Sequence, residues 1–231
     1  APVYREAHAA ACQRGRARMA RSRAVLCGLA RDVAAVLPLN LARLSRIGSG
    51  FADHRMVILE NDSTDGTPRL LSDAARRDPR LLVVSESFGA PRWPAVRDPR
   101  RGADMARCRN RLAAEVLGRF GDFDHVIVAD LDLEGWSYEG VASSFGHDGW
   151  DAMASTGIRF LGTRPFFYDA WALRAVGHPE PCGTYDARTM VFPRGTPPVP
   201  VRSAFSGLAI YPMAVFRVGR YAGGDCEHVT F

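Results

Sequence analysis

Short apolar runs that alternate with helix-forming stretches constrain the fold of this chain more than any other feature. Runs suited to buried strands occupy residues 24–29, 56–59, 80–84 and 125–129. Stretches with helical composition or pattern occupy residues 4–22, 32–47, 68–77 and 103–118. This alternation predicts an α/β fold in which helices flank a mostly parallel central sheet.

Two prolines predict how the helices begin and bend. Pro38 lies inside the helical pattern of residues 32–47 and predicts a kink or an early break. Thr67 followed by Pro68 predicts a helix N-cap and a first helical position.

Beyond residue 135 the pattern becomes irregular. We expect a short helix near residues 138–145 and strand-like pieces at 151–156 and 166–172, whereas residues 177–200 contain six prolines. For residues 85–102 we expect a long surface excursion. With no internal repeat and no low-complexity linker, residues 1–231 are expected to form one domain with a nucleotide-binding-like first half.

Composition excludes several classes of protein. No stretch reaches the roughly 18 consecutive apolar residues that span a bilayer, and no apolar signal core is found at the start, so the sequence predicts a cytoplasmic protein. The five cysteines are an odd number and contain no Cys-x-x-Cys pair. Reduced, packed thiols are therefore expected, and a disulfide framework or a zinc ribbon is not.

The formal charge of +5 comes from arginine alone, because the chain has no lysine. Six arginines between Arg5 and Arg23 face one acidic residue, Glu6. We favour a solvated helix face for this segment, ahead of a peripheral contact with an anionic membrane or an acidic partner. Nucleic acid is the least favoured partner, and none is expected.

Two acidic clusters begin where apolar runs end. One extends from Glu60 to Asp65, and the other is Asp130-Leu131-Asp132. Ligands of an open parallel sheet bind beyond the carboxyl ends of its strands, so both clusters are expected in one crevice. In an extended segment Asp130 and Asp132 point to the same face, where a divalent cation such as Mg²⁺ or Mn²⁺ would relieve their repulsion.

Arg109 lies on the apolar stripe of the helix at residues 103–118. A guanidinium on a buried face requires an anionic partner. Two partners remain open, namely Asp130 in a structural ion pair and a phosphate or hydroxyl of a substrate.

The sequence Asp225-Cys226-Glu227-His228 brings two acids and an imidazole together. If the segment is extended, Asp225 and Glu227 share a face and offer a general base, and His228 is a candidate third metal ligand. A surface acidic tail is the alternative. A zinc site at Cys226 and His228 is less favoured because other soft ligands are few.

Together these residues resemble nucleotide-sugar-dependent glycosyltransferases of the GT-A fold. Residues 57–67 resemble the first strand-to-helix signature of that class, and Asp130-Leu131-Asp132 matches its Asp-x-Asp motif. Glu60 to Thr67 combined with the helix sequence Ala106-Arg107-Cys108-Arg109-Asn110 is similar to fungal capsule-type and mannan-type mannosyltransferases.

The resemblance implies a role for each matching residue. Glu60, with Asn61 or Asp62, would hold the nucleoside, whereas Asp65 would serve the turn and the helix cap. Asp132 would bind the metal that bridges the donor diphosphate, with Asp130 orienting it. The other implied donor-binding residues are Arg31, Arg107, Arg109 and Asn110. Asp225 or Glu227 would be the base.

The implied activity is metal-dependent transfer of a sugar, such as mannose, from a GDP- or UDP-sugar to a hydroxyl of a glycan acceptor. Residues 24–135 would bind the donor and residues 136–231 the acceptor. Two alternatives stay open: a nucleotidyltransferase, and a non-catalytic carbohydrate-binding protein. The first would usually carry a glycine-rich loop with a basic residue, but residues 24–33 contain one glycine.

Overall fold

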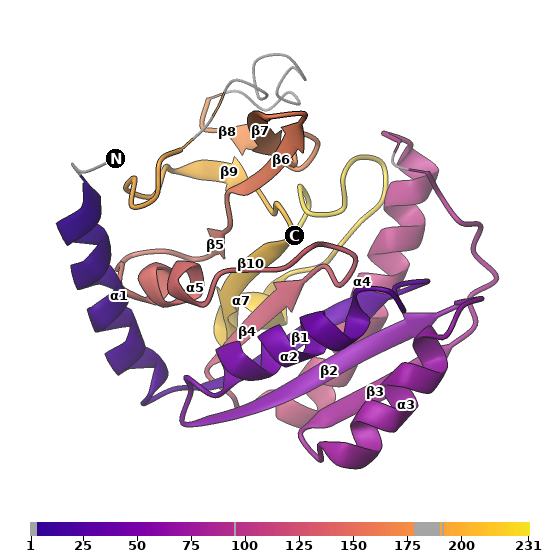
Figure 1. Cartoon of the computed structure of the whole chain (residues 1–231). Coiled ribbons are helices and arrows are strands. Elements are labelled where there is room, and N and C mark those ends of the chain that lie inside the picture. The colour runs from indigo at the N-terminus through magenta and orange to yellow at the C-terminus, as the bar shows by residue number, and fades with distance from the viewer. Residues whose placement is uncertain (1–3, 95, 178–189, 191) are drawn as a thin grey trace.

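The computed structural model describes residues 4–94, 96–177, 190 and 192–231. Its core is a six-stranded sheet in the order β3-β2-β1-β4-β10-β5, with helices on both faces (Figure 1). The strands are β1 (Arg23–Ala30), β2 (Asp53–Asn61), β3 (Leu81–Glu86), β4 (His125–Ala129), β5 (Met153–Ala154) and β10 (Leu208–Pro212).

Strands β1 to β4 are parallel where they pair, and β10 lies antiparallel beside β4. The predicted α/β fold with a mostly parallel sheet is therefore confirmed. The chain runs from β1 outward to β2 and β3 on one side, and then crosses back to form β4 on the other side of β1. The carboxyl ends of these strands meet at the kind of switch point where α/β sheets bind ligands.

The sheet is buried on both faces, which explains why its strands are apolar almost throughout. Along β1, Ala24 and Leu26 join one core cluster, and Val25 and Cys27 join the other. The first cluster lies under α2 (Leu37–Gly48), α3 (Thr67–Arg77) and α5 (Tyr138–Phe145). The second lies under α4 (Pro99–Phe120) and α7 (Met213–Val218). Each large apolar side chain buried in this way contributes about 1.5–3 kcal/mol.

Two helix starts differ from the sequence-based expectation. Helix α2 begins at Leu37, so Pro38 occupies its first turn, where a missing amide hydrogen costs nothing, and the predicted kink was wrong. The N-cap of α3 is Gly66 and not Thr67. The Thr67 hydroxyl instead accepts a hydrogen bond from the Val33 amide at 2.9 Å, and Asp65 Oδ1 accepts one from the Thr67 amide at 2.8 Å.

Helix α4 begins earlier than predicted. Asp98 caps it by accepting a hydrogen bond from the Arg100 amide, and Pro99 follows at a position that suits proline. The predicted excursion over residues 85–102 is thereby shortened at both ends, because β3 continues to Glu86.

The N-terminal helix α1 (Arg5–Met19) packs against α5. Arg14 Nε donates to the Gly146 carbonyl at 3.2 Å, and Arg18 Nη1 donates to the carbonyls of Phe145 and His147 at 3.0 and 2.8 Å. Cations are favourable at a helix C-terminus because carbonyl groups there lack partners. These two arginines of the basic segment thus bind the protein itself.

Among the described residues, no helix is both long and apolar enough to cross a membrane.

The second half adds smaller elements around the sheet. Strands β6 (Gly157–Leu161) and β7 (Arg164–Tyr168) form a hairpin, and β8 (Arg174–Ala175) pairs with β9 (Val201–Ser203). The helix over residues 138–145 is confirmed, but the predicted strands were too long, since β5 has two residues and β7 ends at Tyr168. Residues 178–189 and 191 of the proline-rich region, with Cys182, lie outside the described residues. The four other cysteines are free and buried, as predicted.

Candidate active site

The two predicted acidic clusters do meet at one edge of the sheet. Glu60 pairs with Ala30 in the β1–β2 register, so β2 and β1 end together. Asp130 directly follows β4, and its amide donates to the Gly207 carbonyl at 3.0 Å. That bond places the start of β10 beside the same edge.

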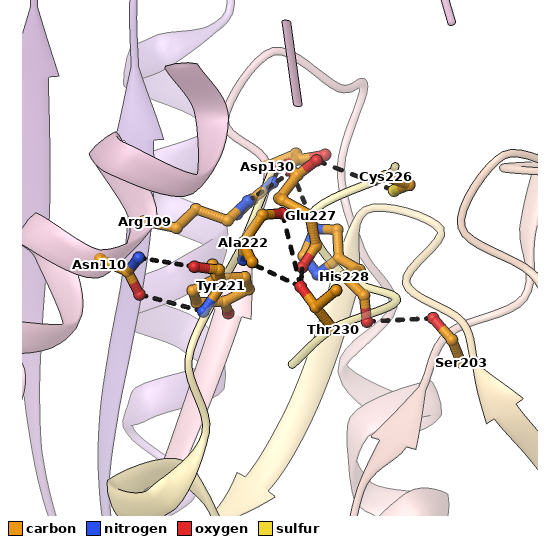
Figure 2. A network of polar contacts seen from close by, with 10 residues as sticks. All are labelled: Arg109, Asn110, Asp130, Ser203, Tyr221, Ala222, Cys226, Glu227, His228 and Thr230. Atoms are coloured by element: carbon orange, nitrogen blue, oxygen red, sulfur yellow. Dashed lines mark hydrogen bonds and ion pairs between the residues drawn. The ribbon is translucent and has the colours of Figure 1, made fainter. Parts of the chain in front are cut away.

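At the centre of this edge, Arg109 joins two carboxylates (Figure 2). Its Nη2 donates to Asp130 Oδ1 at 2.9 Å, and its Nε donates to Glu227 Oε1 at 2.8 Å. The side chain is 3% exposed, and its guanidinium carbon lies 4.8 Å from the centre of the Phe205 ring. Although burial opposes it, the two carboxylates raise the pKa of Arg109 well above its ordinary value, so the side chain is charged.

Arg109 retains one unused donor. Its Nη1 is buried and has no hydrogen-bond partner among the described residues. The predicted ion pair with Asp130 is thus present. The alternative partner, a substrate oxygen, stays a prediction.

Asp130 and Asp132 lie in different environments. Burial raises the pKa of Asp130 to about 6, and Asp132 and Glu227 add to this while Arg109 opposes it. Asp132 is exposed in the turn that follows β4, with Leu131 buried between the two acids. The strand predicted at residues 125–129 is confirmed, but the assumption of an extended segment over 130–132 was wrong, because a turn begins at Leu131. The two acids are nevertheless close enough to repel each other.

Asn40 holds the turn that carries Asp132 in place. This buried side chain of α2 donates from Nδ2 to the carbonyls of Leu131 and Leu133 at 2.9 and 2.7 Å. Nothing in the sequence singled out Asn40, because an asparagine inside a helix has no motif.

The donor set at this edge suits one kind of metal ion. Among the described residues, no group of three or more His, Cys, Asp or Glu side chains is arranged to hold a metal. Mg²⁺ and similar ions commonly bind through one or two carboxylates and take their remaining ligands from water and substrate phosphates. Asp130 and Asp132 fit that mode.

His228, the predicted third ligand, lies in a packed interior position. Its ring stacks on Phe205 with 3.7 Å between ring centres, and its Nε2 lies 3.4 Å from Glu227 Oε1. Burial, together with Arg109, lowers the pKa of His228 well below its ordinary value, so the imidazole is neutral. Both ring nitrogens of His228 are buried and have no hydrogen-bond partner among the described residues, so its role as a third ligand stays a prediction.

The carboxylates of Glu60 and Asp62 both accept hydrogen bonds from neighbouring parts of the chain. Glu60 is buried, and its carboxylate accepts bonds from the Ser63 amide, at 3.0 Å, and from the Ser85 hydroxyl. Asp62 has a positive φ of 51° and accepts bonds from Ser87, Phe88 and Gly89 at 2.7 to 3.2 Å. Led by the Ser87 bond, these contacts hold the pKa of Asp62 far below its usual range. Asn61 lies between them in the sequence, and its Oδ1 is 3.9 Å from the Sγ atom of Cys108.

The segment that Asp62 holds also engages the predicted donor-binding arginines. Arg31 donates to the carbonyls of Ala90 and Pro91 at 2.9 and 3.1 Å. The Arg107 guanidinium carbon lies 4.6 Å from the centre of the Phe88 ring. We call residues 87–94 and 96–98 the strap, because they belong to the segment that links β3 to α4.

Asn110 of α4 binds the C-terminal segment. Its amide exchanges hydrogen bonds of 2.8 and 3.1 Å with the backbone of Tyr221. This pairing secures the C-terminal segment that carries Asp225, Glu227 and His228.

The two predicted bases bind different arginines. Asp225 Oδ2 accepts a bond from Arg174 Nη2 at 2.5 Å, and Asp225 Oδ1 accepts one from the Cys226 amide at 2.7 Å. Although burial opposes it, the Arg174 bond lowers the pKa of Asp225. Glu227 is buried against Arg109.

A third acid, Asp169, was missed by the sequence reasoning. Its amide donates to Ser206 Oγ at 3.0 Å, and its Oδ1 accepts a bond from the Trp171 amide at 3.1 Å. Ser206 directly precedes Gly207, the residue that bonds Asp130. Burial, with help from the Glu227 charge, raises the pKa of Asp169, and it forms no ion pair with any described residue. No sequence motif marks it.

Comparison with protein-family models gives no match, and comparison with curated proteins gives none either. Among solved structures, similar ones include the mannosyltransferase PcManGT from Pyrobaculum calidifontis in complex with GDP-Man and Mn²⁺, at 15% identity over 65% of this chain and 44% of that chain, with a TM-score of 0.43. Two structures of S. aureus TarS are also similar. Residues 1–349 of TarS match at 12% identity over 84% of this chain and 48% of that chain, with a TM-score of 0.44. The other matches at 14% identity over 48% of this chain and 16% of that chain, with a TM-score of 0.34.

This chain thus spans less than half the length of each of these proteins. With TM-scores below 0.5, the similarities are too distant to assign a function.

Proposed function

We propose that this chain is a glycosyltransferase that moves a sugar, with mannose as the first candidate, from a nucleoside-diphosphate sugar to a hydroxyl group of a glycan acceptor. One observation carries the proposal. At the switch point of a mostly parallel sheet, two neighbouring acids adjoin a buried, charged arginine that has an unused donor. Acids and a guanidinium at such an edge suit a metal-bound diphosphate.

Each half of the site has its own task in this proposal. Asp132 and Asp130 hold a divalent cation, Mn²⁺ or Mg²⁺, which supplies Lewis-acid stabilisation of the departing diphosphate when it is bound. Arg109 Nη1 donates to a diphosphate or sugar oxygen. Glu60, Asn61 and the strap border the nucleoside, with Arg31 and Arg107 beside them.

In the transfer step the acceptor oxygen forms a bond to the anomeric carbon. The bond from that carbon to the diphosphate breaks, and its electron pair leaves with the diphosphate. The hydroxyl proton passes to a carboxylate of the protein. Asp225, Glu227 and Asp169 are the three candidates for this base.

Asp169 has the best environment for the base. Asp225 and Glu227 each form an ion pair with an arginine, and although burial opposes it, the Arg174 bond lowers the pKa of Asp225. Asp169 has no such partner among the described residues, and its pKa is raised, which brings it nearer to the working pH of a base.

The membrane contact predicted for the N-terminal segment is not part of this proposal. Arg14 and Arg18 are occupied by the C-terminus of α5.

Donor binding tests the proposal directly. We expect one GDP- or UDP-sugar to raise the thermal unfolding temperature in the presence of Mn²⁺, since a ligand at 100 times its Kd stabilises a protein by about 2.7 kcal/mol. Asp132→Asn should abolish this shift. Asp122→Asn, which changes an exposed acid in a surface ion pair, should not. Equal shifts in both variants would contradict the assignment of Asp132.

Product analysis separates the transferase from its alternatives. Release of nucleoside diphosphate from the stabilising donor supports the proposal. Formation of a nucleotide sugar from a sugar phosphate would indicate a nucleotidyltransferase, and binding without turnover would indicate a carbohydrate-binding protein.

The base is tested by comparing Asp169→Asn, Asp225→Asn and Glu227→Gln in single-turnover reactions. Loss of a general base typically lowers the rate about 10²- to 10⁴-fold. We expect the largest loss of rate for Asp169→Asn with donor affinity retained. A larger loss in either of the other variants would transfer the role to that residue.

A further inference from the structure

One end of the molecule exposes apolar side chains that have no cover among the described residues. Five of the eight large apolar side chains that are most exposed lie between residues 158 and 201, and Phe160 is 68% exposed. The five are Ile158, Phe160, Val176, Val199 and Val201. Figure 1 shows β6, β7, β8 and β9, which carry or adjoin them, grouped at the end of the molecule opposite α3. We call this set the hairpin surface.

The shape of the β6–β7 hairpin explains the exposure. Near its base, Phe167 is buried and packs with Leu173 in a small separate cluster. Towards its tip, Phe160 pairs with Pro165 beyond that cluster, and both are exposed. The tip therefore projects an aromatic side chain that packs against no core.

The same region is strongly basic. Arg159, Arg164 and Arg202 are exposed, and none forms an ion pair within the described part of the chain. Asp169 is the one acidic residue among residues 157–177 and 192–204, and it is half-buried at the candidate active site. An excess of unpaired arginine beside exposed apolar groups attracts a surface that is anionic and also offers hydrocarbon.

We propose that the hairpin surface docks onto an anionic lipid membrane, with Phe160 inserted at the level of the headgroups and the three arginines contacting lipid phosphates. A second copy of the chain fits less well, because a symmetric contact would bring three unpaired arginines against three more. An apolar protein partner would leave the same charges without counterions. The proposed function and this surface are independent of each other.

Vesicle sedimentation tests the docking. We expect the protein to pellet with vesicles of phosphatidylcholine mixed with phosphatidylglycerol, and to stay in the supernatant with phosphatidylcholine alone. Raising the salt concentration should release it, because exposed charges are screened. Replacing one arginine, as in Arg164→Gln, should weaken binding about fivefold.

Two matched variants distinguish an effect of the hairpin surface from an effect of any exposed apolar side chain. Phe160→Ser should reduce pelleting about tenfold or more, since burial of one aromatic side chain is lost. Val218→Ser, at a side chain that is 78% exposed on α7, should leave it unchanged. Because both side chains are exposed, both variants should fold, and equal thermal unfolding temperatures will verify this.

Three results would overturn the proposal. These are equal pelleting with neutral and anionic vesicles, equal loss in the two variants, and a dimer in light scattering that Phe160→Ser converts to a monomer. The last would assign the hairpin surface to a second copy of the chain.

Discussion

Asn40 Nδ2 donates to the carbonyl oxygen of Leu131 at 2.9 Å, so a side chain of α2 holds the turn that carries Asp132. The same nitrogen also binds Leu133. A helix far away in the sequence therefore determines where an exposed acid of the candidate active site lies. Four predictions follow from contacts of this kind.

Replacing Asn40 should loosen the site and lower its stability. In Asn40→Ala two buried carbonyl contacts are lost, at a cost of about 1–3 kcal/mol in the free energy of unfolding. Donor binding should weaken because Asp132 is less well positioned. Urea unfolding and donor titration measure the two effects. Leu39→Ala, at the exposed neighbouring position, is the control and should change neither.

Removing the charge of Arg109 should destabilise the fold more than any surface change. Arg109→Gln leaves Asp130 and Glu227 without their cation, which costs about 3–5 kcal/mol for a buried pair. The matched control is Arg119→Gln, whose ion pair with Glu115 lies at the surface and is worth less than about 1 kcal/mol. Similar urea midpoints for the two variants would show that the buried network contributes little.

Asp62 should control the order of the strap. In Asp62→Ala the amides of Phe88 and Gly89 lose their acceptor, so their hydrogen exchange should accelerate while that of β1 stays slow. Asp62→Gly removes the same contacts but relieves the positive φ, and should be the more stable of the two variants. If exchange at Gly89 is unchanged in both, Asp62 does not hold the strap.

The stabilisation from two buried histidines should be lost as the pH drops below about 6.5, whereas the raised pKa of Asp130 acts in the opposite direction. Burial lowers the pKa values of His54 and His125, so the unfolded state takes up protons that the folded state does not. The stabilisation from neutral histidine is therefore complete above the unfolded pKa and is lost as the pH falls towards the folded one. His125→Phe, which keeps the ring packed against Phe145, should make the curve of unfolding free energy against pH shallower below 6.5. Parallel curves for the two proteins would contradict this assignment.

The first half of the fold was predictable because its signals are local. The strand over residues 125–129 matches β4 residue for residue, since its four apolar residues lie between His125 and Asp130. The start of α4 also had a local signal in Asp98-Pro99. The sequence did not predict β10, because nothing near Leu208 indicates that it pairs with Ala129.

The candidate active site was predictable in part for the same reason. The ion pair between Arg109 and Asp130 followed from a charge on an apolar helix face. Asn40 and Asp169 were missed because their partners, Leu131 and Ser206, are distant in sequence and brought together only by the fold.

The antiparallel pairing of β10 with β4 has a consequence for how this architecture can change. Since the backbone of Asp130 is fastened to Gly207, the chain that leaves the sheet after β4 returns to it beside the same residue. A change of length at the tip of the β6–β7 hairpin therefore leaves both anchored ends, and Asp130 with them, in place.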